Sequence, residues 1–257
     1  MRRFEHLNKD IMQHIVPNPG KRKLLPELSA KAQVALMCRM CFREGWNDHI
    51  AGHITLRLEN GNILTNPWEL AWDELTAGDI VTLDADGNNL DSDWNVTPAI
   101  GLHLQLHKMR EDAHVVMHNH PEWSGKWACL QRVPPIYDQS SAYVQGELPV
   151  FDEYQGTFDS DDKTLAAATA LGDASWALLA NHGALVVGKN LRQAHLRLIT
   201  LEWRSRRAYE IELLGGAEPL PAALIPETAR ADDNGFPFLW EAMARREIRK
   251  DPSVLED

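Results

Sequence analysis

The sequence is poor in cysteine and in basic residues, and it contains no long hydrophobic run. Its three cysteines, Cys38, Cys41 and Cys129, are too few for a disulfide framework, so a reducing cytoplasm is the expected location. The net charge of -11 argues against nucleic acid or an anionic membrane surface as a partner. No run approaches about 18 apolar residues, and the charged start of the chain lacks an apolar segment after it. We therefore expect neither a transmembrane helix nor a secretory signal.

What remains is the composition of an ordinary globular enzyme, with 257 residues, 44% of them hydrophobic and 25% charged. Residues 1–25 are polar and interrupted by Pro and Gly, which predicts an N-terminal arm. We expect one domain at residues 26–216, and at 217–257 a linker and a C-terminal helix packed on that domain. Short strands separated by turns and helices predict an α/β fold with a mixed sheet and helices on its faces.

Capping residues and apolar periodicity predict the individual elements. Helices are expected at about 29–43, 97–110, 121–130, 161–171, 191–214 and 238–249, and strands at 50–58, 62–66, 79–83, 115–120, 176–182 and 184–187. Residues 136–150 are expected to be extended. The helix after Pro121 should place Trp123, Trp127 and Leu130 on one face. Cys38 and Cys41 form a CxxC in the middle of a helix without a second cysteine pair, so we interpret them as helix-face residues.

Residues 115–120, VVMHNH, are an apolar run that ends in two histidines. Such a run predicts a buried strand, and because side chains alternate along a strand, His118 and His120 should share one face. A second apolar run, residues 176–182, ends in His182. Three imidazoles at strand ends would suit one metal ion, but an HxH pair is also found as a plain polar strand terminus. Spacing alone leaves both interpretations open.

The order of these signals resembles the class II aldolase/adducin head-domain family over roughly residues 27–215. The matching segments are AGHITLR at 51–57, LTNP at 64–67, DELT at 73–76, DIV at 79–81, LH at 102–103, VVMHNH at 115–120 and NHGALVVG at 181–188. The resemblance implies a three-layer α/β/α domain with a central mixed, largely antiparallel sheet, assembled as a homotetramer with active sites between neighbouring subunits. It also implies that His118, His120 and His182 bind one divalent metal ion per subunit. Zinc is the first choice, and manganese, cobalt or iron are alternatives.

The sequence departs from the sugar-phosphate aldolases of that family at the acid/base residue. Those enzymes carry a metal-binding glutamate where this chain has Ala99. Their phosphate-binding positions correspond here to His53, Glu69, and Thr97 with Pro98. A glutamate would repel a phosphate dianion, and proline has no backbone N–H to offer. The chain is therefore more similar to the adducin-like and decarboxylase-like branch.

These features predict a metal-dependent carbon–carbon lyase acting on a small unphosphorylated oxo-, hydroxy- or hydroxyaryl acid. The bond would break by decarboxylation or retro-aldol cleavage through a metal-stabilised enolate. Decarboxylation needs only a proton donor after the bond has broken, so Ala99 favours it over aldol cleavage. Two other classes stay open: a non-catalytic adducin-like scaffold, and a three-histidine metal hydrolase or oxygenase.

Several side chains are candidates for proton transfer and substrate binding. The candidate acid/base residues are Glu122, His53 and His49. Glu122 is equally well explained as a carboxylate that favours the N-terminus of a helix. The candidate substrate-binding residues are Thr97, Asn66, Gln139, Tyr143 and His103. His103 and Tyr143 could instead be packed core residues.

Overall fold

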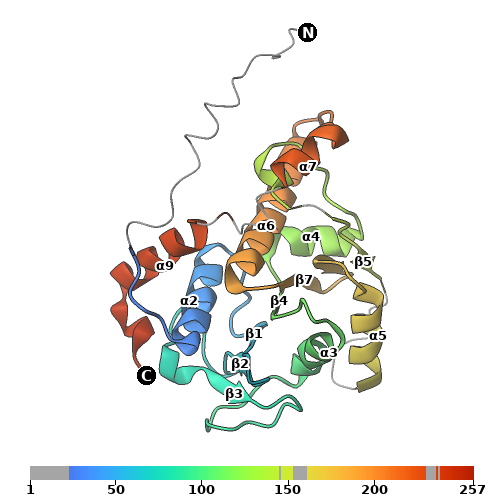
Figure 1. Cartoon of the computed structure of the whole chain (residues 1–257). Coiled ribbons are helices and arrows are strands. Elements are labelled where there is room, and N and C mark those ends of the chain that lie inside the picture. Colours follow the sequence, from blue (N-terminus) through green and yellow to red (C-terminus); the bar gives the residue numbers. More distant parts are fainter. Residues whose placement is uncertain (1–22, 145, 153–160, 230–235, 237) are drawn as a thin grey trace.

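The computed structural model describes residues 23–144, 146–152, 161–229, 236 and 238–257. Most of the predicted arm lies outside these ranges, and so do residues 159–160, which precede the helix predicted at 161–171. The described chain forms a seven-stranded sheet with helices on both faces, as Figure 1 shows. Among the described helices, none combines the length and apolar character needed to cross a bilayer.

The sheet is mixed and largely antiparallel, as predicted. Its strands are β1 His53–Arg57, β2 Ile63–Thr65, β3 Val81–Leu83, β4 Val115–Asn119, β5 Val150–Phe151, β6 Trp176–Leu179 and β7 Gly183–Gly188. They follow the order β3-β2-β1-β4-β7-β6-β5. Every neighbouring pair is antiparallel except β5 and β6. The strand that ends in the two histidines therefore lies in the middle of the sheet, between β1 and β7.

Different helices cover the two faces of the sheet. The helices are α2 Ala30–Arg43, α3 Gly101–Met109, α4 Glu122–Leu130, α5 Asp161–Leu171, α6 Leu191–Leu213, α7 Ile225–Thr228 and α9 Leu239–Lys250. Short 3-10 turns are η1 Ala77–Asp79, η2 Pro98–Ile100, η3 Ser140–Ala142, η4 Ala222–Leu224 and η5 Pro252–Leu255. Val115 and Met117 face the core under α2 and α6, whereas Val116 faces the core under α3 and α5. This alternation produces the predicted three layers.

Local sequence explains where the main helices begin. The Ser29 hydroxyl accepts a hydrogen bond from the Ala32 N–H at the start of α2, and the Asn190 side chain accepts one from Gln193 N–H at the start of α6. Thr97 caps η2, with Pro98 at its first position, and η2 continues directly into α3. The starts at Ser29 and Thr97 were predicted from the capping residues, whereas the Asn190 cap was not.

Three local details differ from what the sequence suggested. Of the three residues predicted on one face of α4, Trp127 is buried, together with Ser124 and Ala128, whereas Leu130 at the end of the helix is exposed. Residues 136–150 were expected to be extended, but they contain the turn η3. The expected linker after residue 217 includes η4 and α7, because Pro221 stands at the N-cap of η4 and Pro226 in the first turn of α7, where proline is tolerated.

The C-terminal helix packs beside α2 (Figure 1). The Arg43 guanidinium forms an ion pair with the buried carboxylate of Glu247. Buried Arg39 donates hydrogen bonds to the Leu75 carbonyl at 2.7 Å and to the Asp251 carboxylate at 2.8 Å. These contacts connect α9 and the turn after it to the helix that covers the sheet.

His195 in α6 makes the fold sensitive to acid. Its side chain is fully buried, and neither ring nitrogen has a hydrogen-bond partner among the described residues. Burial, together with the nearby charge of Arg246, lowers the pKa of this imidazole from 6.5 to about 3. The unfolded chain therefore takes up this proton first as the pH falls. The stability that depends on neutral His195 is complete above about pH 6.5 and is lost as the pH falls towards the folded pKa.

We predict that this residue alone lowers the free energy of unfolding by about 2 kcal/mol between pH 7 and pH 5. Urea unfolding at both pH values should show this loss in the wild-type protein. In His195→Leu, which keeps an apolar side chain of similar size, the loss should be smaller by about that amount. An equal loss in the two proteins would contradict the assignment.

Candidate metal centre

The pairing of β4 in the middle of the sheet positions the first two histidines. His118 lies opposite His53 of β1 and opposite Leu185 of β7. The intervening Asn119 points to the other face, where its amide donates to the Trp46 carbonyl at 3.3 Å. The Asn119 side-chain oxygen also accepts a hydrogen bond from the backbone N–H of His120 at 2.7 Å. The alternation expected from the HxH pattern is therefore present.

His182 reaches the same place from the turn between β6 and β7. The sequence predicted that His182 stands at the end of a strand, but it lies in the turn, one residue before β7. A Cβ atom on Gly183 would lie 2.3 Å from the Asn119 carbonyl oxygen and 3.0 Å from a ring carbon of His120. Only glycine allows the start of β7 to approach the end of β4 this closely, and this approach brings His182 beside His120.

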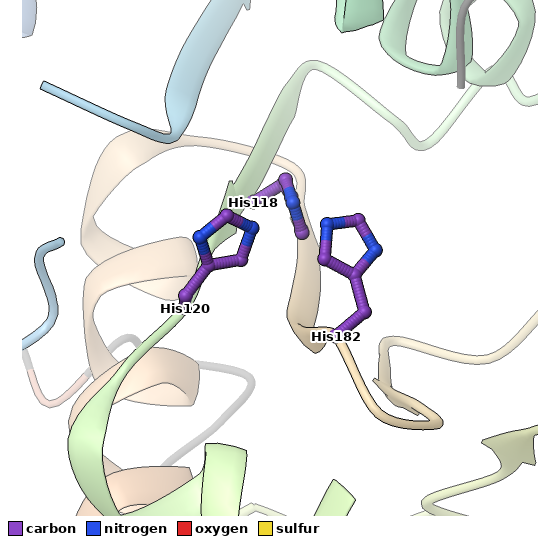
Figure 2. Close-up of side chains that lie close together, drawn as sticks. All are labelled: His118, His120 and His182. Atoms are coloured by element: carbon purple, nitrogen blue, oxygen red, sulfur yellow. The ribbon is translucent and has the colours of Figure 1, made fainter. Parts of the chain in front are cut away.

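The three imidazoles form one compact cluster, which Figure 2 shows. One ligand nitrogen from each of His118, His120 and His182 can be chosen so that all lie within 4.8 Å of one another. Ring centroids are separated by 5.2 Å for the first and second histidines, 4.7 Å for the first and third, and 4.8 Å for the second and third. Histidine nitrogens bind zinc at about 2.0–2.1 Å, so small side-chain rotations would close this set around one ion.

Hydrogen bonds fix which nitrogen of each β4 histidine is free to bind. The His118 Nδ1 donates to the Ala184 carbonyl at 3.0 Å, and the His120 Nδ1 donates to the Asp48 carboxylate at 2.9 Å. In a neutral imidazole the other nitrogen, Nε2, then carries the lone pair. The Nε2 of His120 is buried and has no hydrogen-bond partner among the described residues. A carboxylate or carbonyl behind a histidine is the usual support of a metal ligand.

Burial lowers the pKa of two of the three imidazoles, those of His118 and His182. It lowers the pKa of His118 well below the ordinary value, with His53, His182 and His120 adding smaller effects. Burial and His120 lower the pKa of His182 to about 4. Neutral imidazoles are the form that binds metals. The donor set and its tautomers therefore fit a divalent ion such as zinc.

Asp48 is the functional residue that sequence reasoning missed. It lies in the loop before β1, and its two oxygens accept hydrogen bonds from His120 at 2.9 Å and from His49 at 2.7 Å. The His120 hydrogen bond, followed by that of His49, lowers the pKa of this carboxyl. The only signal in the sequence was its position beside His49, and this gave no hint of a contact with a residue 72 positions later.

Two further predicted histidines lie next to the cluster, on the face covered by α3. The ring of His53 is 5.3 Å from that of His118, and the ring of His103 is 4.2 Å from that of His53, measured between centroids. Both side chains are buried, and both have an Nε2 without a hydrogen-bond partner in the described part of the chain. Burial lowers the pKa of His53 to about 3 and that of His103 well below its usual range.

The remaining candidates near the start of β1 and α4 are engaged in other contacts. The Asn66 side chain accepts from the Ile54 N–H at 2.9 Å and donates to the Gly52 and Pro67 carbonyls, so it supports the start of β1. The Thr97 hydroxyl caps η2. Glu122 is exposed and forms an ion pair with Lys126 at 3.1 Å, and the His49 side chain is 93% exposed. Substrate or proton-transfer roles for these four residues stay predictions.

Tyr143 is not brought to the three histidines within this chain. It lines a separate cavity of about 430 Å³, together with Trp123 and Trp203, on the α4 and α6 side of the molecule. Its ring packs against Phe236 with a centroid separation of 5.3 Å. Gln139 stands just before η3, near the same region. If Tyr143 or Gln139 contacts the substrate, it must do so in the site of a neighbouring subunit, since the resemblance implies active sites between subunits.

Comparison with known proteins agrees with this arrangement. Residues 32–209 match the family model described as "Class II Aldolase and Adducin N-terminal domain". The chain is 27% identical over 241 residues to 3,4-dihydroxyphthalate decarboxylase of Arthrobacter keyseri, covering 88% of this chain and 95% of that protein. It is 28% identical over 183 residues to 3-oxo-tetronate 4-phosphate decarboxylase of Escherichia coli, covering 68% and 84%. The fold resembles L-fuculose 1-phosphate aldolase of Glaciozyma antarctica with a TM-score of 0.74 and 19% identity, covering 91% and 97% of the two chains.

The hydrogen bond from His120 to the Asp48 carboxylate should strengthen metal binding. We predict one zinc ion per chain, removed by chelators, with His118→Ala losing tight binding. Asp48→Asn should weaken binding about 10- to 100-fold, because the amide can no longer hold His120 as a carboxylate does. Competition with a chromophoric chelator measures these constants. Glu59→Gln, an exposed substitution in the β1–β2 turn, is the control, and an Asp48→Asn affinity equal to that of the control would exclude the supporting role.

Proposed function

The chain belongs to the class II aldolase and adducin N-terminal domain family, and from this premise we propose that it is a metal-dependent carbon–carbon lyase. Its substrate would be a small unphosphorylated oxo-, hydroxy- or hydroxyaryl acid. Relatives named decarboxylases support a lyase-type activity in general terms. The observation that carries the proposal is the cluster of three imidazoles, in which Nδ1 of both β4 histidines is hydrogen-bonded and Nε2 is left to bind a metal.

The cluster would hold the metal through His118, His120 and His182. When bound, a divalent ion there supplies a Lewis acid that polarises an oxygen beside the bond that breaks. Within the described residues, the group contains no fourth His, Cys, Asp or Glu. A three-ligand site leaves room for substrate oxygens, as in catalytic rather than structural metal sites.

Ala99 favours decarboxylation over aldol cleavage. It lies in η2, at the position where the sugar-phosphate aldolases that the sequence resembles carry their acid/base glutamate, and its methyl group packs against the core under α3. A methyl group cannot bind a metal or move a proton. Loss of carbon dioxide requires no base to begin, so a site without this glutamate suits it better than a retro-aldol step.

The surroundings of Glu69 and Pro98 support an unphosphorylated substrate. The Glu69 carboxylate accepts hydrogen bonds from the Asn95 backbone N–H at 3.1 Å and 3.2 Å, which holds a negative charge on the loop before η2. Pro98, at the first position of η2, has no N–H with which to hold a phosphate. The Arthrobacter keyseri relative is named for a dihydroxyaryl acid without phosphate.

We predict that the zinc- or manganese-loaded protein releases carbon dioxide from a hydroxyaryl or 2-oxo acid and turns over sugar phosphates poorly. Steady-state kinetics on 3,4-dihydroxyphthalate, a 2-oxo acid and fuculose 1-phosphate compare the classes directly. His118→Ala should lose turnover while its circular dichroism stays native, because only a metal ligand has been removed. Ala99→Glu should not raise the activity on the acids.

Efficient turnover of the sugar phosphate, at a kcat/KM of about 10⁴ M⁻¹s⁻¹ or more, would contradict the assignment of substrate class. Absence of turnover on every acid, with the metal bound, would favour the adducin-like scaffold. Consumption of dioxygen with an iron-loaded protein would favour the oxygenase alternative.

We also propose that the chain assembles as a homotetramer. Apolar side chains remain exposed along the second half of α6, including Trp203 at 47%, Leu213 at 69% and Leu214 at 87%. Burial of these side chains against another copy of the chain would remove them from water. Light scattering at micromolar concentration should give about four times the 29.0 kDa chain mass. A monomer would contradict the assembly and would leave Tyr143 and Gln139 without a route to the site.

A further inference from the structure

A buried hydrogen-bonded chain runs from the face of β1 into α3, beside the metal cluster. The Thr55 hydroxyl oxygen lies 3.0 Å from His103 Nδ1 and 2.7 Å from His107 Nε2. At the far end, His107 Nδ1 lies 2.6 Å from the Ala113 carbonyl oxygen. All three side chains are at most 4% exposed.

The direction of every hydrogen bond in this chain follows from its far end. A carbonyl oxygen only accepts, so His107 Nδ1 carries the proton there and His107 Nε2 carries a lone pair. The Thr55 hydroxyl therefore donates its hydrogen to His107 and must accept from His103. His103 then holds its proton on Nδ1, and its Nε2 carries an unprotonated lone pair.

Burial keeps both histidines neutral: it lowers the pKa of His107 to about 4 and that of His103 well below the ordinary value. A doubly protonated His107 would have no lone pair to accept from Thr55, and a doubly protonated His103 would have none on Nε2. The Val116 carbonyl, 3.4 Å from the Thr55 hydroxyl, is a more distant acceptor than His107 Nε2 at 2.7 Å.

The lone pair of His103 has no donor within the described residues. Its Nε2 is buried without a hydrogen-bond partner, and so is the Nε2 of His53, whose ring centroid is 4.2 Å from that of His103. The His53 ring in turn lies 5.3 Å from the ring of His118. A buried polar atom normally has a hydrogen-bond partner. Two buried nitrogens without one, beside a metal cluster, therefore indicate that a polar group of a ligand binds there.

We propose that His103 and His53 form a hydroxyl-recognition subsite next to the three-histidine cluster, and that His103 Nε2 accepts a hydrogen bond from an O–H group of the substrate. Thr55 and His107 act through His103 and are positioning residues that fix its tautomer. This inference rests on the proposed lyase function and narrows its substrate to an acid with a hydroxyl group close to its metal-binding oxygens.

An acceptor nitrogen at this point selects against anions. A lone pair repels a carboxylate or phosphate oxygen and attracts a neutral hydroxyl hydrogen. A site that hydrogen-bonds a substrate hydroxyl also discriminates strongly against the analogue without it, because its own buried group is then left unpaired. The subsite would therefore recognise a phenolic, enolic or alcoholic O–H.

The tautomer is tested without substrate or metal. Nitrogen-15 NMR of the histidine-labelled, chelator-treated protein at pH 7 should show His103 protonated on Nδ1, with assignment from His103→Phe. The same state should persist in Thr55→Ser, which keeps the hydroxyl. It should be lost in Thr55→Val, which has the same shape without the hydroxyl.

Ligand selection is tested by calorimetry on the zinc-loaded protein with 2,3-dihydroxybenzoate and 2-hydroxybenzoate, which differ by one hydroxyl. The wild-type protein and Thr55→Ser should prefer the dihydroxy acid by about tenfold or more. Thr55→Val and His103→Phe should bind both acids with similar affinity. Circular dichroism of each variant establishes that it is folded.

A His103 protonated on Nε2, equal preference in the wild-type protein, or unchanged preference in Thr55→Val would overturn the subsite. If only an ordered water occupies it, the wild type will show equal preference. The zinc titration and carbon dioxide assay report separately on the proposed function. If the protein binds metal and turns over its substrate but shows no preference between the two acids, only the subsite is rejected. If it binds no metal while His103 keeps its proton on Nδ1, the lyase function is rejected.

Discussion

The close approach of β4 and β7 is the contact on which the rest of the site depends. Gly183 removes the side chain that would otherwise collide with the Asn119 carbonyl, and His182 is brought against His120 as a result. The same pairing places the Ala184 carbonyl where it accepts a hydrogen bond from His118 Nδ1. A single missing Cβ atom thus determines both the position of one imidazole and the tautomer of another.

Buried neutral imidazoles dominate the chemistry of this face of the sheet. The rings of His103, His53, His118, His182 and His120 follow one another with centroid separations between 4.2 Å and 5.3 Å. Burial and the neighbouring imidazoles lower the pKa of four of them, His103, His53, His118 and His182. A divalent cation would bind three of these lone pairs, and a hydroxyl group would satisfy another.

The sequence predicted the parts of the site that follow a local period. Alternation along one strand put His118 and His120 together, capping residues located α2 and η2, and apolar periodicity located α6. Asp48 and the Thr55–His107 contact could not be predicted in this way, because each joins residues more than 50 positions apart. The exposure of Leu130 could not be predicted for a related reason. Several phases of α4 are apolar, and only the packing against α6 decides which of them is buried.

The described sheet is bounded by very short strands, with three residues in β3 at one border and two in β5 at the other. Short edge strands present few free N–H and C=O groups, so another strand can form few hydrogen bonds with them. Growth by joining sheets edge to edge is therefore disfavoured in this molecule. Copies of the chain that associate must do so through their helices and loops, and the central strands that carry the histidines are left undisturbed by assembly.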